Sequence, residues 1–171
     1  MNIIYARNNQ GYIGKENQLL YNFKKDMVFF REKTTGNTLI FGYRSFMEIG
    51  KPLKNRKTIV IVDKNRQYNQ MVGVNYVSNI QEAIELYNKE PFGELFICGG
   101  KSIYDDVFKN YHEQIKKIFE TVVLSHDIGD TKVSFDTSSF RLASKIKEVD
   151  KDRCSEKYYN IVFKTLEKNG L

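Results

Sequence analysis

The sequence has no tryptophan, only two prolines and only two cysteines among its 171 residues. Cys98 and Cys154 lack the spacing of a metal site, so we expect reduced thiols and a cytoplasmic protein. Residues 1–7 lack the basic and long apolar regions of a signal peptide. No run of about 18 apolar residues is present, which argues against a membrane-spanning helix. His112 and His126 have no nucleophile close in sequence, so neither a hydrolytic triad nor a zinc site is indicated.

Charge and overall composition are those of an ordinary globular protein. Hydrophobic residues make up 41% and charged residues 28%, which excludes a disordered tail or a low-complexity array. The length predicts a single domain over residues 1–171. The net charge is +6, but acidic residues interleave with the basic ones, and the densest basic stretch is only residues 51–57. We therefore expect a small anionic ligand or a solvated lysine-rich surface, rather than a nucleic acid.

Short apolar segments alternate with helical patterns along the chain. The patterns predict strands at residues 3–6, 38–41, 58–62, 74–77 and 95–98, and helices at 26–33, 45–49, 80–88 and 103–110. Asn79 is the expected N-cap of the third helix. Longer alternating segments at 118–124, 140–149 and 158–166 are typical of antiparallel strands. Together they predict an α/β fold: a mostly parallel sheet with helices on both faces, an antiparallel C-terminal edge, and a ligand crevice at the carboxyl ends of the strands.

Four local patterns carry candidate chemistry. Gly99-Gly100, between a strand and a helix, is either an anion site or a tight turn that needs glycine torsions. Asp26 either stabilises the start of its helix or lines the crevice, where it would hold an amidine-like heterocycle or supply a proton. Arg56 is either a surface residue or a clamp on a substrate carboxylate. Segment 11–17, with glycines near both ends, suits a mobile lid in a loop.

Six motifs also occur in a fixed order along residues 1–166. They are Gly11-Tyr12-Ile13-Gly14-x-x-Asn17-x-Leu19, Asp26-Met27-x-Phe29-Phe30, Phe41-Gly42-x-Arg44-Ser45-Phe46-x-x-Ile49-Gly50, Pro52-Leu53-x-x-Arg56, Gly99-Gly100-x-x-Ile103-Tyr104 and Gly129-Asp130-Thr131. Taken together, they resemble dihydrofolate reductase. The resemblance implies a three-layer, eight-stranded α/β fold and NADPH-dependent reduction of 7,8-dihydrofolate to tetrahydrofolate. It also implies binding of antifolates such as methotrexate or trimethoprim, and we expect a monomer.

The resemblance assigns roles residue by residue. Asp26 would hold the pterin and assist protonation at N5, Thr131 would hold Asp26 through a hydrogen bond, and Tyr21 stands in for the family's lid tryptophan. The implied substrate-binding residues are Ile4, Tyr5, Leu19, Phe30, Ile49, Leu53, Arg56, Cys98 and Tyr104. The implied cofactor-binding residues are Ala6, Ile13, Asn17, Gly42, Tyr43, Arg44, Ser45, Val62, Asp63, Lys64, Gly99, Gly100, Lys101, Ser102 and Ile103. A cis peptide is expected between Gly99 and Gly100, and a lid over residues 9–20.

The sequence departs from the family pattern at the pocket for the cofactor 2′-phosphate. Tyr43 stands where the family commonly has arginine, and Arg44 follows it. Asp63-Lys64 replaces the usual Ser/Thr and basic residue, and an aspartate there would repel a phosphate or accept from a ribose hydroxyl. We therefore expect NADPH to be preferred, with NADH possible.

Two other functions fit the same sequence. One is a same-fold reductase acting on another pterin- or pyrimidine-like substrate, as in riboflavin synthesis, and the other is a non-catalytic binding protein. Asp26 together with Arg56 favours the folate enzyme, because the pair suits a pterin with a glutamate tail.

Overall fold

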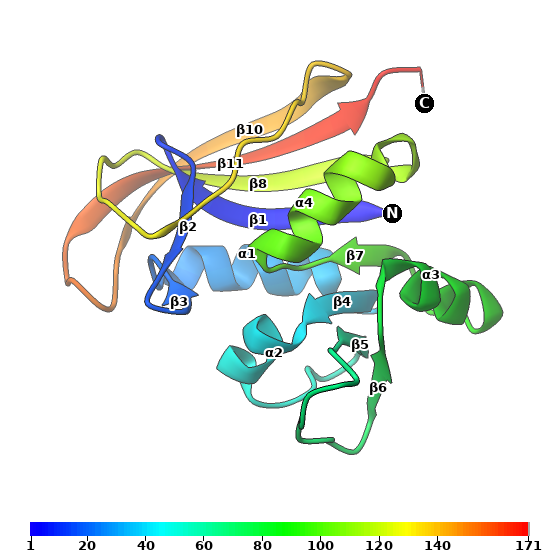
Figure 1. Cartoon of the computed structure of the whole chain (residues 1–171). Helices are drawn as coiled ribbons and strands as arrows, with labels where there is room; N and C mark the ends of the chain where they lie inside the picture. Colours follow the sequence, from blue (N-terminus) through cyan, green and yellow to red (C-terminus); the bar gives the residue numbers. More distant parts are fainter. Residues whose placement is uncertain (171) are drawn as a thin grey trace. The chain divides into compact units, whose positions relative to one another are not determined.

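The computed structural model describes residues 1–170, and the chain divides into two compact units. Unit 1 comprises Met1 and Thr34–His112, and unit 2 comprises Asn2–Lys33 and the chain from Glu113 onward. The strands of the two units make up a mixed eight-stranded α/β sheet with four α-helices, which confirms the predicted fold class (Figure 1). The prediction of a single domain stays a prediction. No helix within the described residues 1–170 is long and apolar enough to cross a membrane.

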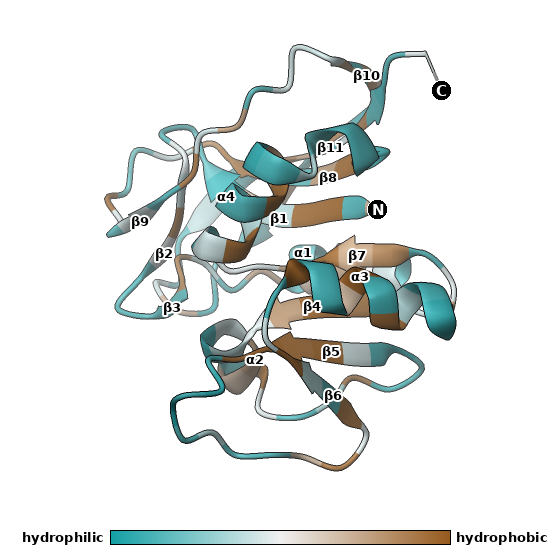
Figure 2. Ribbon diagram, turned by 45° about the vertical axis from the view of Figure 1, so that its right-hand side comes forward, coloured by the Kyte–Doolittle hydropathy of each residue, from teal (hydrophilic) through white to brown (hydrophobic). Residues whose placement is uncertain are grey.

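Unit 1 is built on four parallel strands. Their order is β7 (Leu95–Ile97), β4 (Thr38–Gly42), β5 (Lys57–Ile61) and β6 (Val74–Val77). The helices of this unit are α2 (Tyr43–Ile49), α3 (Ile80–Lys89) and α4 (Lys101–Asn110). Figure 2 shows β4, β5 and β7 as mostly hydrophobic strands. Leu39, Ile40, Ile59 and Val60 are fully buried, as expected for parallel strands that are covered on both faces.

Helix α3 begins at the predicted cap. The Asn79 side chain accepts a hydrogen bond from the Glu82 N–H at 2.9 Å, and the Glu82 carboxylate accepts from the Ser78 N–H at 2.8 Å. The first bond satisfies a backbone donor that the first helical turn leaves without a partner, and the second ties the residue before the cap to the helix. Ile80 and Ala83 lie on the buried side of the helix, and α3 contacts β5 and β6. The predicted cap is therefore confirmed.

Unit 2 combines one parallel pair with two antiparallel strands. Its order is β10 (Phe140–Lys151), β11 (Tyr158–Lys168), β8 (Lys117–Val123) and β1 (Asn2–Asn8). Strands β1 and β8 are parallel, and β11 runs antiparallel to both β8 and β10. The predicted antiparallel C-terminal strands are thus confirmed, with β11 inside and β10 at the edge. Helix α1 (Lys24–Thr34) packs on this sheet through Phe29, whose ring lies 4.7 Å from that of Phe163. A short 3-10 helix, His112–Gln114, precedes β8.

The expected loop over residues 11–17 is instead a hairpin in a second, three-stranded sheet. Strand β2 (Tyr12–Lys15) pairs with β3 (Gln18–Leu19) on one side and with β9 (Thr131–Lys132) on the other. Glu16 and Asn17 form the turn with φ of 53° and 62°, the positive values that a tight two-residue hairpin turn requires. The prediction failed because this turn lacks glycine and because β9 is distant in sequence.

Removing the α3 cap should lower stability measurably. Asn79→Ala leaves the Glu82 N–H without its side-chain acceptor, so we expect a loss of about 1 kcal/mol in the free energy of unfolding. Thermal or urea denaturation measures it. Asn88→Ala, at an exposed position of the same helix, is the matched control and should change stability by less than about 0.5 kcal/mol. Equal effects of the two changes would contradict the role of the cap.

Candidate active site

A small hollow in unit 2 collects residues that are far apart in the sequence. Its volume is about 20 Å³. Its walls come from β1, the β2–β3 hairpin, the start of α1 and β8. The lining residues are Ala6, Tyr12, Ile13, Leu19, Leu20, Tyr21, Phe23, Asp26, Thr121 and Val123. Among them, Ala6, Ile13, Leu19, Tyr21 and Asp26 are predicted site residues, so the structure brings these five together.

Asp26 is the only carboxylate among the residues that line this hollow. It lies in the first turn of α1, and its Oδ1 accepts a 2.7 Å hydrogen bond from the hydroxyl of Thr121. Burial raises the pKa of the Asp26 carboxyl above its ordinary value, and the hydrogen bond from Thr121 lowers it by less. The carboxyl therefore keeps its proton to a higher pH than an exposed aspartate, as a proton donor requires.

The hydrogen bond to Asp26 comes from a different threonine than the one predicted. Thr131 donates instead to its neighbour Asp130, at 2.9 Å. Thr121 occupies the expected position because it lies on β8 with its side chain on the same strand face as Val123. The alternating pattern of residues 118–124 was the signal that could have identified Thr121, because it places a threonine on one face of a buried strand.

Tyr21 is held in the wall of the hollow by its hydroxyl and by ring contacts. Its hydroxyl donates to Asp127 Oδ2 at 3.1 Å, and Tyr159 donates to the same oxygen at 2.9 Å. The Tyr21 ring stacks on Phe23 with 5.5 Å between centroids. Burial raises the pKa of Tyr21, so the phenol is neutral. These contacts fix an aromatic wall at the position where the family pattern has tryptophan, whereas a catalytic role for Tyr21 stays a prediction.

The Tyr5 side chain does not line this hollow, and its role in substrate binding stays a prediction. Its hydroxyl donates to Glu120 at 2.9 Å, and its side chain lines a different cavity from that of Ala6. Successive residues of a strand point to opposite faces, so Ile4 and Ala6 share one face of β1 and Tyr5 lies on the other. Phe30 follows Asp26 by one helical turn and so lies on the same side of α1.

A second group of predicted residues gathers in unit 1 around a glycine turn. The peptide between Gly99 and Gly100 is cis, as expected, and the Gly99 carbonyl accepts from the Gly42 N–H at 2.7 Å. A Cβ added at Gly100 would lie 2.8 Å from Ser45 Oγ, and one added at Gly42 would lie 3.2 Å from Ile103 Cγ1. The backbones therefore approach each other at distances that side chains would prevent.

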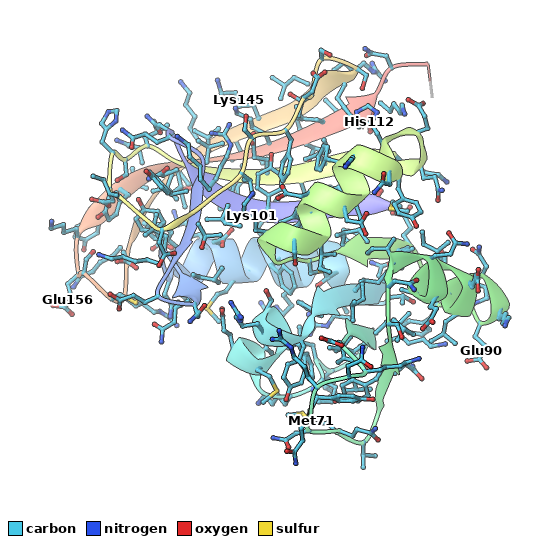
Figure 3. The ribbon with its side chains drawn as sticks, in the orientation of Figure 1. Met71, Glu90, Lys101, His112, Lys145 and Glu156 are labelled. Carbon is cyan, nitrogen blue, oxygen red and sulfur yellow. The ribbon has the colours of Figure 1, made fainter. Side chains whose placement is uncertain are left out.

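Helix α4 begins directly after this turn. Gly100 is its N-cap and supplies no side-chain hydrogen bond. Ser102 is exposed, and Lys101 forms an ion pair with Asp105 at 2.6 Å; Figure 3 labels Lys101 at this helix start. N–H groups at a helix start, combined with a close glycine backbone, suit a phosphate group.

Two of the predicted substrate residues of unit 1, Cys98 and Tyr104, lie beside this glycine turn. Cys98 follows β7, and Tyr104 is buried, with its hydroxyl 3.0 Å and its nearest ring atoms 3.1–3.2 Å from the position of a Cβ on Gly99. Burial raises the pKa of the Cys98 thiol, which Arg56 lowers by less, so the thiol is neutral and unreactive. Ile49 ends α2, and Leu53 is half-buried.

Arg56 has two of its donors already engaged. Its Nε donates to the Lys54 carbonyl at 2.9 Å and its Nη1 to Thr34 Oγ1 at 3.3 Å. These bonds fix the plane of the guanidinium. Such an orientation suits recognition of a carboxylate, although the clamp itself stays a prediction.

The residues after β5 are paired in a way that the sequence did not reveal. Asp63 accepts from the Asn65 N–H at 2.9 Å and forms an ion pair with Arg66 at 3.3 Å, while Lys64 lies 3.5 Å from Glu82. The charge of Asp63 is thus partly compensated by Arg66, a residue that the sequence reasoning missed. Val62, just before this segment, is buried against β6.

Tyr43 anchors the following loop. Its hydroxyl accepts from the Asn69 N–H at 3.1 Å, and its ring contacts Tyr68. Arg44, next to it on α2, is exposed. Within residues 1–170, no group of three or more His, Cys, Asp and Glu side chains is arranged to hold a metal ion.

Comparison with known proteins decides the family. A family model described as dihydrofolate reductase matches residues 1–168. The chain belongs to the dihydrofolate reductase family. The dihydrofolate reductase of Bacillus subtilis (strain 168) is 28% identical over 145 residues, which is 84% of this chain and 82% of the relative. The dihydrofolate reductase of Staphylococcus aureus (strain MSSA476) is 30% identical over 131 residues, or 77% and 76% of the two chains.

A solved dihydrofolate reductase structure gives the same result. The Enterococcus faecalis enzyme, complexed with NADP(H) and RAB-propyl, is 28% identical and aligns with a TM-score of 0.81. The alignment covers 98% of this chain and 95% of that one. The resemblance to dihydrofolate reductase seen in the six sequence motifs is therefore confirmed for fold and family.

Replacing Asp26 should stabilise the fold at neutral pH. Because the folded-state pKa is raised, the stability that this group contributes is full below the unfolded pKa of about 4 and is lost as pH rises through the folded pKa. Asp26→Asn cannot ionise, and its amide oxygen still accepts from Thr121. We therefore expect a higher melting temperature than wild type at neutral pH, and a difference that shrinks in acid.

Melting curves across pH measure this difference. Asp105→Asn, which changes an exposed carboxylate on α4, is the matched control and should show no such gain at neutral pH. An Asp26→Asn protein with unchanged or lower stability at neutral pH would contradict the raised pKa.

Proposed function

We propose that this chain reduces 7,8-dihydrofolate to 5,6,7,8-tetrahydrofolate with NADPH, and that Asp26 assists protonation at the pterin N5. The observation that carries the proposal is the half-buried carboxyl of Asp26, hydrogen-bonded by Thr121, in a chain that belongs to the dihydrofolate reductase family. A carboxyl with a raised pKa keeps the proton that reduction of the substrate requires. The same carboxyl offers two oxygens to the amino group and ring nitrogen of the pterin.

The unit 1 residues fit a nicotinamide dinucleotide. NADPH supplies the hydride when bound. The glycine backbone at Gly99 and Gly100 and the start of α4 would hold its pyrophosphate, because a Cβ at Gly100 would fill the space beside Ser45. Ala6 and Ile13, from the hollow beside Asp26, would contact the nicotinamide and exclude water from it. The Enterococcus faecalis enzyme was solved as a complex with NADP(H), which supports the choice of cofactor.

The pairing of Asp63 bears on the choice between the two nicotinamide cofactors. An unpaired aspartate would repel a 2′-phosphate, but Asp63 is engaged by Arg66 and by the Asn65 N–H. Arg44 and Lys64, the latter 3.5 Å from Glu82, would supply positive charge to the phosphate. We therefore propose NADPH as the preferred cofactor and NADH as a weaker one.

The remaining parts of the proposal concern the glutamate tail of the substrate, the inhibitors, and the location and partners of the protein. Arg56, with its plane fixed by Lys54 and Thr34, would bind the α-carboxylate of the glutamate. Antifolates such as methotrexate or trimethoprim would compete with the substrate. The cytoplasmic location, the monomeric state and the absence of nucleic-acid or membrane partners stay predictions.

The proposal is tested by following NADPH absorbance in the presence of dihydrofolate and purified protein. We expect oxidation that methotrexate inhibits, and slower oxidation with NADH. A folded protein that oxidises neither cofactor would overturn the proposal and favour the reductase of another pterin- or pyrimidine-like substrate.

The proton role of Asp26 predicts a pH-dependent loss of turnover in Asp26→Asn. An amide cannot deliver the proton, so turnover at neutral pH should fall by about 100-fold, with partial recovery in acid, where solvent supplies the proton. Steady-state rates across pH measure it, and an unchanged affinity for NADPH shows that the fold is retained. Near-normal turnover at neutral pH would contradict the role of Asp26.

The glycine turn predicts a specific loss of cofactor binding. Gly99 has φ of 109° and Gly73 has φ of 81°, so alanine is strained at both, but only Gly99 lies in the turn. Each change should cost about 1–3 kcal/mol of stability, whereas only Gly99→Ala should weaken NADPH binding, by about tenfold, or about 1.4 kcal/mol. Fluorescence titration with NADPH at a temperature where both variants are folded measures it. Equal NADPH affinities in the two variants would contradict the assignment.

A further inference from the structure

The strands that carry Ala6 and Thr121 have a second cavity on their other face. This cavity lies within unit 2 and has a volume of about 630 Å³, within the range of small-molecule sites, which is roughly 300–1,000 Å³. Tyr5, Arg7 and Glu120 line it, whereas Ala6 and Thr121 line the hollow beside Asp26. The alternation of side chains along β1 and β8 therefore separates the two sites by the thickness of the sheet.

A bulge in β10 shapes the wall of this cavity. Leu142 pairs with Leu166 of β11, but the next pair is Ser144 with Thr165, so one extra residue is inserted in β10. In a regular strand, residues 142 and 145 would point to opposite faces. The inserted residue brings both Leu142 and Lys145 to the cavity.

A row of directly opposed residues crosses the cavity floor. Lys145 pairs with Lys164, Lys164 with Glu120, and Glu120 with Tyr5. Glu120 is buried, accepts from the Tyr5 hydroxyl, and forms ion pairs with Arg7 at 2.5 Å and Lys164 at 3.6 Å. The glutamate is thus fully engaged by protein groups.

The remaining charges of the cavity are positive and uncompensated. Lys145 faces Lys164 directly, and like charges opposed across a strand pair destabilise the sheet. Lys132, which also lines the cavity, lies over the Tyr12 ring. Within residues 1–170, no carboxylate lies within ion-pair distance of Lys145 or Lys132. An anion held by these lysines would relieve the repulsion.

The cavity also offers an apolar surface beside its charges. The Phe135 and Tyr5 rings meet edge to face, with 5.4 Å between centroids. Leu142 leaves 54% of its surface exposed, and Leu166 is half-buried beside it. A flat apolar group packed on these side chains would bury surface that is now in contact with water.

We propose that this cavity is a second binding site, for a small organic anion with a flat apolar body. The acidic group lies with Lys145 and Lys132, and the body packs on Phe135 and Leu142. Lys145 is labelled on β10 in Figure 3. The site stands on its own geometry and does not depend on the proposed reaction.

The test uses anilinonaphthalene sulfonate, an aromatic anion whose fluorescence rises in apolar sites, titrated into protein saturated with NADPH and methotrexate. We expect saturable one-to-one binding. Lys145→Glu should weaken this binding by about tenfold, because it replaces an attractive charge with a repulsive one. Lys147→Glu changes the same charge on the same exposed strand but outside the cavity, so it should leave the affinity within about twofold.

Three outcomes would overturn the proposal. Equal weakening by the two variants would show a response to net charge alone. Absence of saturable binding would show that the cavity holds no such anion. Binding that is seen in the free protein but not in protein saturated with NADPH and methotrexate would place the probe at the Asp26 site. Both lysines are exposed, so the variants should fold, and the probe's own fluorescence reports binding whether or not the protein turns over dihydrofolate.

Discussion

The parallel pairing of β1 with β8 is the constraint on which both sites of unit 2 depend. In this register Ala6 lies opposite Thr121, and Tyr5 lies opposite Glu120. The first pair faces Asp26 and the second faces the cationic cavity. A slip of one residue would exchange the two faces, placing a glutamate beside Asp26 and removing its hydrogen bond. The Tyr5–Glu120 hydrogen bond and the Arg7–Glu120 ion pair hold the register from the far side.

Asp26 shows how function and stability compete at this site. A carboxyl shielded from water loses hydration, and the single hydrogen bond from Thr121 offsets only part of that loss. The fold tolerates the residue because it sits in the first turn of α1, beside an aromatic cluster of Phe23 and Phe163 that supplies the packing. A carboxyl that donates a proton near neutral pH needs a raised pKa, and here the loss of hydration that raises the pKa also costs stability.

The sequence alone predicted the features that depend on near neighbours. The continuous apolar strands of unit 1, the Asn79 cap and the glycine turn at Gly99-Gly100 are each readable within a few residues. The errors involve either partners distant along the chain or the detailed geometry of a turn. The family resemblance assigned the hydrogen bond with Asp26 to Thr131, and Thr121 was missed because the face on which it lies depends on how its strand pairs. The Asp63–Arg66 ion pair was missed because turn geometry, rather than composition, brings the two charges together.

The small sheet that carries the hairpin is packed through its main chain. The Gly14 carbonyl accepts from the Asp130 N–H at 3.1 Å, and a Cβ added at Gly129 would lie only 2.4 Å from that carbonyl oxygen. A Cβ on Gly14 itself would lie 2.8 Å from the Gln18 carbonyl. Contacts of this kind break and re-form without repacking any core side chain. The hairpin can therefore move without disturbing the core, but it cannot accept side chains at its glycines. Sequence variation in this segment should concentrate at its solvent-facing positions and spare the glycines.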